Sequence, residues 1–302
     1  MHFLVTGGAG FIGNHLAHHL LNKQHSVTII DNLHSGKMEN LDDIKDKIIF
    51  HKIDILDYNK LKELVKNVDG IFHEAALTVV QESFDKPDEY NLVNVKGTEN
   101  IFKLANEFDK KVVYASSSSV YGNPVKIPVK EDAIRKPLNP YGETKLQDEY
   151  LAEGFSSKGT KIIGLRYFNV YGKGQSISYA GVITKFLDRI RNHQPPIING
   201  DGLQVRDFVY VEDVVNANLL AMESKIDSAF INIGSGKIIS ILELANMAIK
   251  AADLDMKPIH ANPLQGDVKE SQADISLAKR LIGWNPTVEL KDWLKQVLSR
   301  EK

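Results

Sequence analysis

Short apolar runs alternate with helical repeats through the first half of the chain. Residues 2–6 are apolar and β-prone, and a glycine-rich turn separates them from a helical pattern that begins near residue 16. The later β-prone runs lie at 26–30, 47–52, 68–73, 111–115 and 160–167. The helical stretches between them lie at 61–65, 90–106 and 141–156. This alternation predicts an α/β fold with a doubly wound parallel sheet that binds ligands at the carboxyl ends of its strands.

The regular alternation loosens after about residue 170. A strand from 205 leads into a helix that runs to about Met222. The other expected elements are helices at 179–192, 241–250, 273–282 and 290–298 and short strands from 195, at 230–233 and at 257–260. We therefore expect two lobes. Residues 1–169 with about 205–224 form the larger one, and 170–204 with 225–302 form a smaller C-terminal α/β lobe that binds substrate.

Composition narrows the possible partners and compartments. The 302 residues carry 37 Lys and Arg against 39 Asp and Glu, a net charge of −2, which gives no electrostatic reason to expect nucleic acid or an anionic membrane as partner. The chain has no cysteine, which excludes disulfides and thiolate chemistry. No apolar run approaches the ~20 residues that span a bilayer, and the start lacks a secretory signal pattern. We expect a cytoplasmic protein.

The glycine-rich turn predicts a dinucleotide site. Glycine lets the backbone approach a pyrophosphate, and the helix that follows offers free N–H groups. The next strand ends in Asp31, whose carboxylate can accept hydrogen bonds from the adenosine ribose and repels a 2′-phosphate. The expected cofactor is therefore NAD rather than NADP. The turn supplies Gly7, Gly10, Phe11, Ile12 and Gly13, and the loop after Asp31 adds Asn32, Ser35 and Gly36.

Other residues at strand ends extend this predicted groove. Asp54 and Ile55 follow the third strand, where a carboxylate can meet the adenine amine, and Ala75 and Ala76 follow the fourth. Small residues there let a dinucleotide lie against the backbone. Asn94, within the helical stretch 90–106, is either a buried polar tie or a cofactor neighbour, and we favour the second.

Tyr141 and Lys145 lie four residues apart, which places them on one face of a helix that begins after Pro140. A free phenol has a pKa of about 10 and is a poor base at neutral pH. A nearby ammonium favours the phenolate and makes tyrosine a usable proton acceptor. The serines at 116–119, after the fifth strand, form a loop that can also hydrogen-bond a reacting hydroxyl.

Two further groups of residues have competing interpretations. His15, His18 and His19 have a spacing that can bind metal, but such a cluster is more often a solvated face, so we expect no metal. Arg206 either forms a surface salt bridge with Asp207 or Asp213, or clamps a substrate phosphate.

Taken together, these motifs resemble the extended short-chain dehydrogenase/reductase family, and within it the nucleotide-sugar 4-epimerases that act on UDP-glucose and N-acetylated UDP-hexoses. The resemblance covers essentially the whole chain. The stretches that carry it are Gly7–Gly13, Asp31, the serines, Tyr141 with Lys145, the segments 166–169 and 206–211, and Gly266-Asp267-Val268. It implies a Rossmann-type sheet, NAD as a permanently held cofactor, a UDP-sugar substrate and a homodimer paired through the helices at 90–106 and 141–156.

The resemblance also implies roles for single residues. Ser117 and Tyr141 would contact the sugar 4-hydroxyl, and Tyr141 would remove its proton to give a transient 4-keto sugar. That sugar would then rotate within the site. Lys145 would bind the nicotinamide ribose beside Tyr141, with Phe168 also next to the cofactor. Asn169 and Arg206 would contact the diphosphate, and Asp267 the nucleoside ribose.

Three positions distinguish members of the family. Related dehydratases carry carboxylates at both positions after the serine, and related decarboxylases carry a glutamate at the second. This chain has Ser118 and Ser119, which favours epimerisation without elimination. Leu264 replaces the usual nucleotide-binding arginine. Ser271 stands where a bulky tyrosine restricts the pocket to glucose and galactose, so an N-acetyl group fits as well. The alternatives implied by the family are a UDP-glucuronate 4-epimerase, a dehydratase or a 4-keto reductase.

Overall fold

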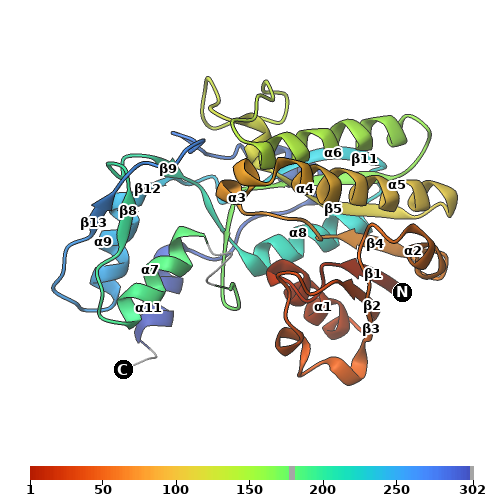
Figure 1. The fold of residues 1–302 in the computed structure, drawn as a ribbon, viewed down its shortest axis with the longest axis horizontal. Coiled ribbons are helices and arrows are strands. Elements are labelled where there is room, and N and C mark those ends of the chain that lie inside the picture. The colour runs from red at the N-terminus through yellow and green to blue at the C-terminus, as the bar shows by residue number, and fades with distance from the viewer. Residues whose placement is uncertain (177–180, 300–302) are drawn as a thin grey trace.

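The computed structural model describes residues 1–176 and 181–299. Its central sheet has seven parallel strands in the order β11-β6-β5-β4-β1-β2-β3, and Figure 1 shows helices on both of its faces. The strands are β1 (His2–Thr6), β2 (Ser26–Asp31), β3 (Ile49–Lys52), β4 (Gly70–His73), β5 (Lys111–Ser117), β6 (Ile162–Tyr167) and β11 (Ser228–Ile233). The expected doubly wound α/β sheet is confirmed.

Helices cover the sheet because strands buried on both faces need apolar partners on both. One face packs against α1 (Phe11–Asn22), α8 (Val211–Glu223) and α10 (Ser276–Ile282). The other packs against α2 (Tyr58–Val65), α5 (Gly97–Glu107) and α6 (Pro140–Ser156). Strand order reverses between β1 and β4, which run side by side at the centre of the sheet. Ligands bind at such a switch point in open α/β sheets.

A second hydrophobic cluster forms the smaller lobe, seen on the left of Figure 1. It packs α7 (Val182–Arg191), α9 (Ile241–Ala251) and α11 (Leu290–Ser299) around the parallel pair β8 (Ile197–Asn199) and β13 (Ile259–Ala261). Short two-stranded pairs connect the lobes, formed by β7 (Asn169–Tyr171), β9 (Val205–Arg206), β10 (Phe208–Tyr210) and β12 (Ile239–Ser240).

The lobe boundary expected at residue 225 is wrong for two segments. Strand β11 pairs with β6 along its whole length and completes the central sheet. Helix α10 then packs its Ala278 and Ile282 into the core of the first lobe, together with Trp284. The chain therefore crosses between the lobes two more times than the sequence pattern predicts. Local periodicity identifies a strand but carries no information about its partner.

Several element boundaries also differ from expectation. Strand β5 continues through Ser117, so two of the four serines belong to the strand. The expected helix over 90–106 consists of α4 (Pro87–Tyr90), a π-helical stretch over Asn91–Lys96, and α5. The expected start of the helix at 179–192 lies partly outside the described residues. A short helix α3 (Val80–Asp85) precedes α4. Among the described helices, none is long and apolar enough to cross a membrane.

Candidate active site

A cavity of about 910 Å³ runs from the glycine turn after β1 to the smaller lobe. This volume lies near the upper end of the range for ligand sites. It is lined by nearly all the residues expected from the sequence to bind cofactor or substrate: Gly7, Gly10, Phe11, Ile12, Gly13, Asp31, Asn32, Ser35, Asp54, Ile55, Ala75, Ala76, Ser117, Tyr141, Lys145, Phe168, Asn169, Arg206, Asp267 and Ser271. Segments that are distant in sequence therefore meet around one space.

The glycine turn forms a cradle with no room for side chains. Gly7 has a φ of +67°, and its amide donates to Ile30 O at 2.8 Å. A Cβ on Gly13 would lie 2.2 Å from Gly7 O, and one on Gly7 would lie 2.8 Å from the backbone of Ala75. Helix α1 begins at Phe11 with no acidic residue in its first turn. The exposed backbone and free helical N–H groups fit the pyrophosphate of a dinucleotide.

Asp31 ends β2 at the side of this cradle. Its Oδ2 accepts from Ala9 N at 3.0 Å and its Oδ1 from Leu33 N at 2.8 Å, so the backbone fixes the carboxyl in place. Burial raises the pKa of Asp31, against those hydrogen bonds. Each oxygen keeps a further lone pair that a ribose hydroxyl can use. Gly36 lies behind the carboxyl rather than in the cavity, because its missing Cβ would come within 2.8 Å of Oδ2.

Asn94 is placed differently from the cofactor role expected for it. It is fully buried in the π-helical stretch and does not line the cavity. Its Oδ1 accepts from Leu77 N at 2.8 Å, and its Nδ2 donates to Leu77 O and to Thr144 Oγ1, each at 3.0 Å. The amide therefore ties the loop after β4 to helix α6. The buried polar tie is the correct interpretation.

Tyr141 and Lys145 occupy the first turns of α6, where the sequence places them. Asn139 is the N-cap, and its Oδ1 accepts from Gly142 N at 2.8 Å, while Pro140 opens the helix. Tyr141 N donates to Ser83 Oγ at 3.1 Å, which fixes the start of α6 against α3. Ser117, the last residue of β5, accepts from Ser119 N at 3.1 Å through its Oγ. The three side chains line the same cavity.

Two buried carboxyl groups near Lys145 are functional candidates that the sequence reasoning missed. Lys145 Nζ lies 3.2 Å from Asp148 Oδ2, and burial raises the pKa of Asp148 to about 7 despite the ammonium. Glu74 lines the cavity and accepts from Tyr167 Oη at 3.0 Å. Burial raises the pKa of Glu74 to about 7 as well, against that hydrogen bond and the Lys145 charge. The spacing of Asp148 after Lys145 was the available signal.

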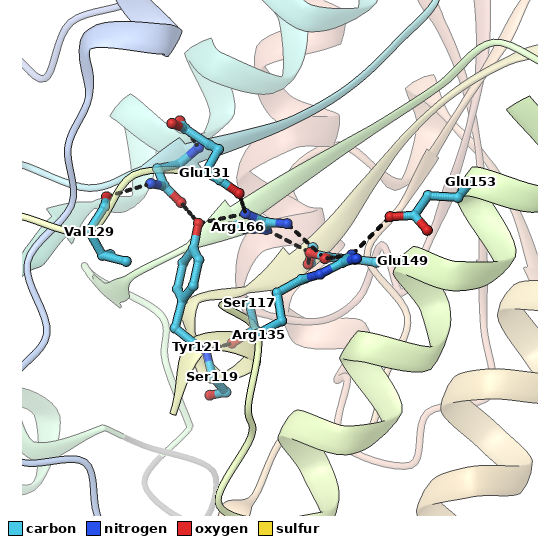
Figure 2. Close-up of polar contacts among 11 residues, drawn as sticks. Ser117, Ser119, Tyr121, Val129, Glu131, Arg135, Glu149, Glu153 and Arg166 are labelled. Atoms are coloured by element: carbon cyan, nitrogen blue, oxygen red, sulfur yellow. Dashed lines mark hydrogen bonds and ion pairs between the residues drawn. The ribbon is translucent and has the colours of Figure 1, made fainter. Parts of the chain in front are cut away.

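A fully paired ion cluster supports the serine segment from behind (Figure 2). Arg166 on β6 forms a two-pronged contact with Glu149 on α6, Nε to Oε1 and Nη2 to Oε2, both at 2.8 Å. Its Nη1 donates to Tyr121 Oη at 2.6 Å and to Glu131 O at 2.8 Å. Arg135 Nη1 adds a contact of 3.0 Å to Glu149. The cluster therefore fixes the position of Ser117 relative to α6.

The far end of the cavity brings together the residues expected to bind substrate. Arg206 forms an ion pair between its Nη2 and Oδ1 of Asp267, and its Nη1 donates to Val205 O at 2.9 Å. The expected alternative partners are occupied elsewhere, since Asp207 accepts from Ser235 and Gly236 amides. Neither surface salt bridge expected for Arg206 is formed. Arg206, expected to contact the diphosphate, and Asp267, expected to contact the nucleoside ribose, instead form an ion pair with each other.

The histidines of α1 serve as structural links. His15 Nδ1 bonds Glu212 Oε1 at 2.5 Å and its Nε2 bonds Lys173 O at 2.9 Å. His18 bonds Asn14 O and Asp43. In the described residues, no group of three or more His, Asp or Glu side chains is placed to hold a metal ion.

Comparisons with known proteins agree with this geometry. The model of the family described as "NAD dependent epimerase/dehydratase family" matches residues 3–234. The structure of the UDP-glucose 4-epimerase of Thermotoga maritima with UDP-glucose has a TM-score of 0.94 at 35% identity, and covers 100% of this chain and 99% of that one. The UDP-glucuronic acid 4-epimerase of Bacillus cereus, solved with UDP-glucuronic acid and NAD, has a TM-score of 0.92 at 32% identity, with both chains covered completely.

A third relative carries a different activity in its name. The UDP-N-acetyl-alpha-D-glucosaminuronate decarboxylase of Bacillus cytotoxicus is 35% identical over 309 residues, covering 98% of this chain and 96% of that protein. Overall similarity of this size therefore does not distinguish epimerases from decarboxylases. The discrimination has to come from the residues of the cavity.

Proposed function

This chain belongs to the NAD dependent epimerase/dehydratase family, and we propose that within it the protein inverts C4 of a UDP-hexose. The substrates would be UDP-glucose and UDP-galactose, with the N-acetylated pair as further candidates. One observation carries the proposal. A continuous cavity joins the dinucleotide cradle, the Ser117–Tyr141–Lys145 group and the Arg206–Asp267 pair, which are the parts that a nucleotide-sugar epimerase needs.

The residues of the cradle fit NAD, the cofactor of the family. Gly7 and Gly13 would leave space for the pyrophosphate, Asp31 would hold the adenosine ribose, and Lys145 would hold the nicotinamide ribose. When bound, NAD supplies a hydride acceptor that can return the hydride to the same carbon. The chain's own contribution is to hold the cofactor, orient the sugar and move one proton.

Tyr141 is the proposed proton acceptor for the sugar 4-hydroxyl. The Lys145 ammonium on the same helix face favours the phenolate, so the tyrosine can take the proton and return it to the same oxygen after inversion. Ser117 Oγ would hydrogen-bond that hydroxyl and align it with Tyr141. Arg206 and Asn169 would hold the diphosphate during the reaction, which leaves the sugar free to present its other face.

The segment after Ser117 argues against elimination chemistry. Ser118 and Ser119 line the cavity at the two positions where related dehydratases and decarboxylases use carboxylates. A serine hydroxyl cannot take up and hand on a proton as a carboxylate does near neutral pH. An epimerase needs only the proton carried by Tyr141, so this pair of serines is compatible with inversion alone.

The deciding experiment gives the purified protein a panel of UDP-sugars without added reductant and follows C4 by NMR. The panel contains UDP-galactose, UDP-N-acetylgalactosamine and UDP-glucuronate. We expect the C4 epimers of the hexoses as the only products. A stable 4-keto sugar, loss of carbon dioxide or a requirement for stoichiometric reductant would refute the proposal, and turnover of the glucuronate alone would move it to the uronate series.

Tyr141→Phe tests the proton acceptor. We expect kcat to fall by roughly 10²–10⁴-fold, because the variant has no group that can accept the proton, while bound NAD is retained. Tyr150→Phe is the matched control, since Tyr150 lies on the same helix but is 52% exposed. Near-normal turnover by Tyr141→Phe would exclude this residue as the base.

Arg206→Ala tests the diphosphate clamp. We expect KM for the UDP-sugar to rise by roughly 10-fold or more with a smaller change in kcat, because a charge-assisted contact to the substrate is lost. Arg206→Lys should recover only part of the loss, since lysine cannot make two parallel contacts. An unchanged KM in Arg206→Ala would show that the arginine serves only to bind Asp267.

We also propose a homodimer paired through α5 and α6. The supporting observation is that Leu92 and Tyr150, in and beside these helices, are each 52% exposed. Sedimentation equilibrium of the wild type and of Leu92→Glu with Tyr150→Glu tests it. We expect a dimer that the double substitution converts to a monomer, and a monomeric wild type would contradict it.

A further inference from the structure

Helix α6 carries a buried acid directly behind Lys145. Asp148 is fully buried and Lys145 is 3% exposed, so their contact of 3.2 Å between Oδ2 and Nζ is shielded from water. Neither catalysis by Tyr141 nor cofactor binding, as described above, needs an acid at this position. A buried carboxyl beside Lys145, the cation proposed to act on Tyr141, changes the electrostatic field at the reacting group.

Asp148 also ends a chain of hydrogen bonds that crosses the sheet. Ala75 N donates to Thr6 Oγ1 at 3.2 Å, and Thr6 Oγ1 lies 2.7 Å from His73 Nδ1. On the other side of the ring, His73 Nε2 lies 2.9 Å from Thr98 Oγ1. The Thr98 hydroxyl is close enough to Asp148 to lower the pKa of that carboxyl in part, against the larger effect of burial. The chain thus connects the ends of β1 and β4 with α5 and α6.

The protonation state of His73 decides which groups donate and which accept in this series of hydrogen bonds. Burial, followed by the charge of Lys145, lowers the pKa of His73 to about 3, so the ring is neutral and carries one N–H. If that hydrogen were on Nδ1, the Thr6 hydroxyl would accept twice and have no acceptor of its own within the described chain. With the hydrogen on Nε2, Thr6 donates to His73 and His73 donates to Thr98. The Thr98 hydroxyl then has its own hydrogen left to offer toward Asp148.

We propose that Asp148 is a positioning residue for Lys145, and that its charge sets the pH at which Tyr141 becomes a base. The inference deepens the proposed function and rests on it. The Asp148 carboxyl contacts the Lys145 ammonium and holds it in place. Because the Asp148 carboxylate is in contact with the Lys145 ammonium, its negative charge offsets part of the electrostatic field that favours the Tyr141 phenolate.

Titration of Asp148 falls in the range where such an enzyme works. Burial raises the pKa of Asp148 to about 7, so the group is mostly neutral below pH 7 and mostly anionic above it. The neutral form leaves the Lys145 charge unopposed, and the anionic form opposes it. The other titratable groups that interact electrostatically with this pair come from α6, β4 with the residue after it, and β5: Glu149, His73, Glu74 and Tyr114.

The test replaces Asp148 in the NAD-loaded enzyme by Asn and, separately, by Ala. Asparagine keeps the shape and an acceptor for Lys145, whereas alanine removes the contact and serves if the asparagine variant does not fold. Two quantities are measured against pH: kcat/KM for the UDP-hexose, and phenolate absorbance in the near ultraviolet after subtraction of the same protein carrying Tyr141→Phe. We expect both profiles of Asp148→Asn to move to lower pH by roughly 0.5–1 unit, because the opposing charge is gone.

Asp213→Asn is the matched control. Asp213 is also a buried carboxyl, but it bonds Thr287 Oγ1 and N in the contact between α8 and the segment before α11. Its replacement should reduce stability and leave both pH profiles unchanged. If the profiles of folded Asp148→Asn and Asp148→Ala do not move, or move to higher pH, the proposal is overturned. A wild type that turns over no UDP-hexose would defeat the proposed function, while the absorbance titration would still decide the role of Asp148.

Discussion

Two neighbouring residues of α6, Glu149 and Asp148, belong to two different buried charge clusters. The clusters differ in how completely their carboxylate oxygens are hydrogen-bonded. Glu149 enters the first, where Arg166, Arg135 and Ser116 bond both of its oxygens at 2.7–3.0 Å (Figure 2). Asp148 enters the second, where it meets Lys145. In the part of the chain that the structure describes, Asp148 Oδ1 and Glu74 Oε2 are buried without a hydrogen-bond partner.

This difference indicates that the first cluster is structural and that the second belongs to a functional site. A buried ion cluster with all of its lone pairs used is rigid, and its parts depend strongly on one another. A cluster with unused oxygens and raised pKa values costs stability in the isolated protein and is typical of functional sites. The first cluster fixes β5, β6 and α6 relative to each other. The second lies under the residues proposed for catalysis and retains the capacity to change its charge.

Removing one partner from the scaffold cluster is the largest perturbation. Glu149→Met leaves Arg166 and Arg135 with no carboxylate between them, and we expect a loss of about 3–5 kcal/mol in the free energy of unfolding. Urea denaturation of the wild type and the variant measures it. The double substitution Glu149→Met with Arg166→Met should recover part of that loss, because no unpaired charge remains in the core. A loss below about 1 kcal/mol in the single variant would show that the two clusters are energetically alike.

The second cluster predicts the pH dependence of stability. Folding raises the pKa of Glu74 from 4.5 and that of Asp148 from 3.8, each to about 7. The folded state then holds protons that the unfolded state releases, so these groups together lower stability by several kcal/mol as pH rises from about 4 to about 7. Denaturation midpoints at equal NAD occupancy measure it. Glu74→Gln, which keeps an acceptor for Tyr167, should flatten the decline, and an identical slope in that variant would contradict the assignment.

Asn94 offers the smallest test, because it is a satisfied tie without a charge. Asn94→Ala removes three hydrogen bonds around Leu77 and Thr144, and we expect a loss of roughly 1–3 kcal/mol in stability. NAD content per protomer should stay at the wild-type level, as measured by absorbance after denaturation. A variant that keeps its stability but loses NAD would restore the cofactor role expected from the sequence.

Much of the cavity could be predicted because its residues belong to local patterns. The glycines at 7, 10 and 13, the acid at the end of β2, and the Tyr141–Lys145 pair each need only spacing and an adjacent strand or helix. Those contexts bring their own geometry, so the residues come to line one cavity. Gly36 and Asn94 show the limit of this reasoning. Both lie in segments that contribute other residues or neighbours to the cavity. Gly36 nevertheless packs behind Asp31, and Asn94 faces the interior of the first lobe.

The sequence alone determined the order of strands and helices, the place of the glycine turn after β1 and the helix face that carries Tyr141, the proposed base. These features depend on contacts within a few residues, which periodicity and spacing encode. Only the tertiary structure decided that β11 completes the sheet, that Arg206 meets Asp267, and that Glu74 and Asp148 keep protons near pH 7. Pairing and desolvation arise from segments that lie far apart along the chain, and no local pattern records which of them will meet.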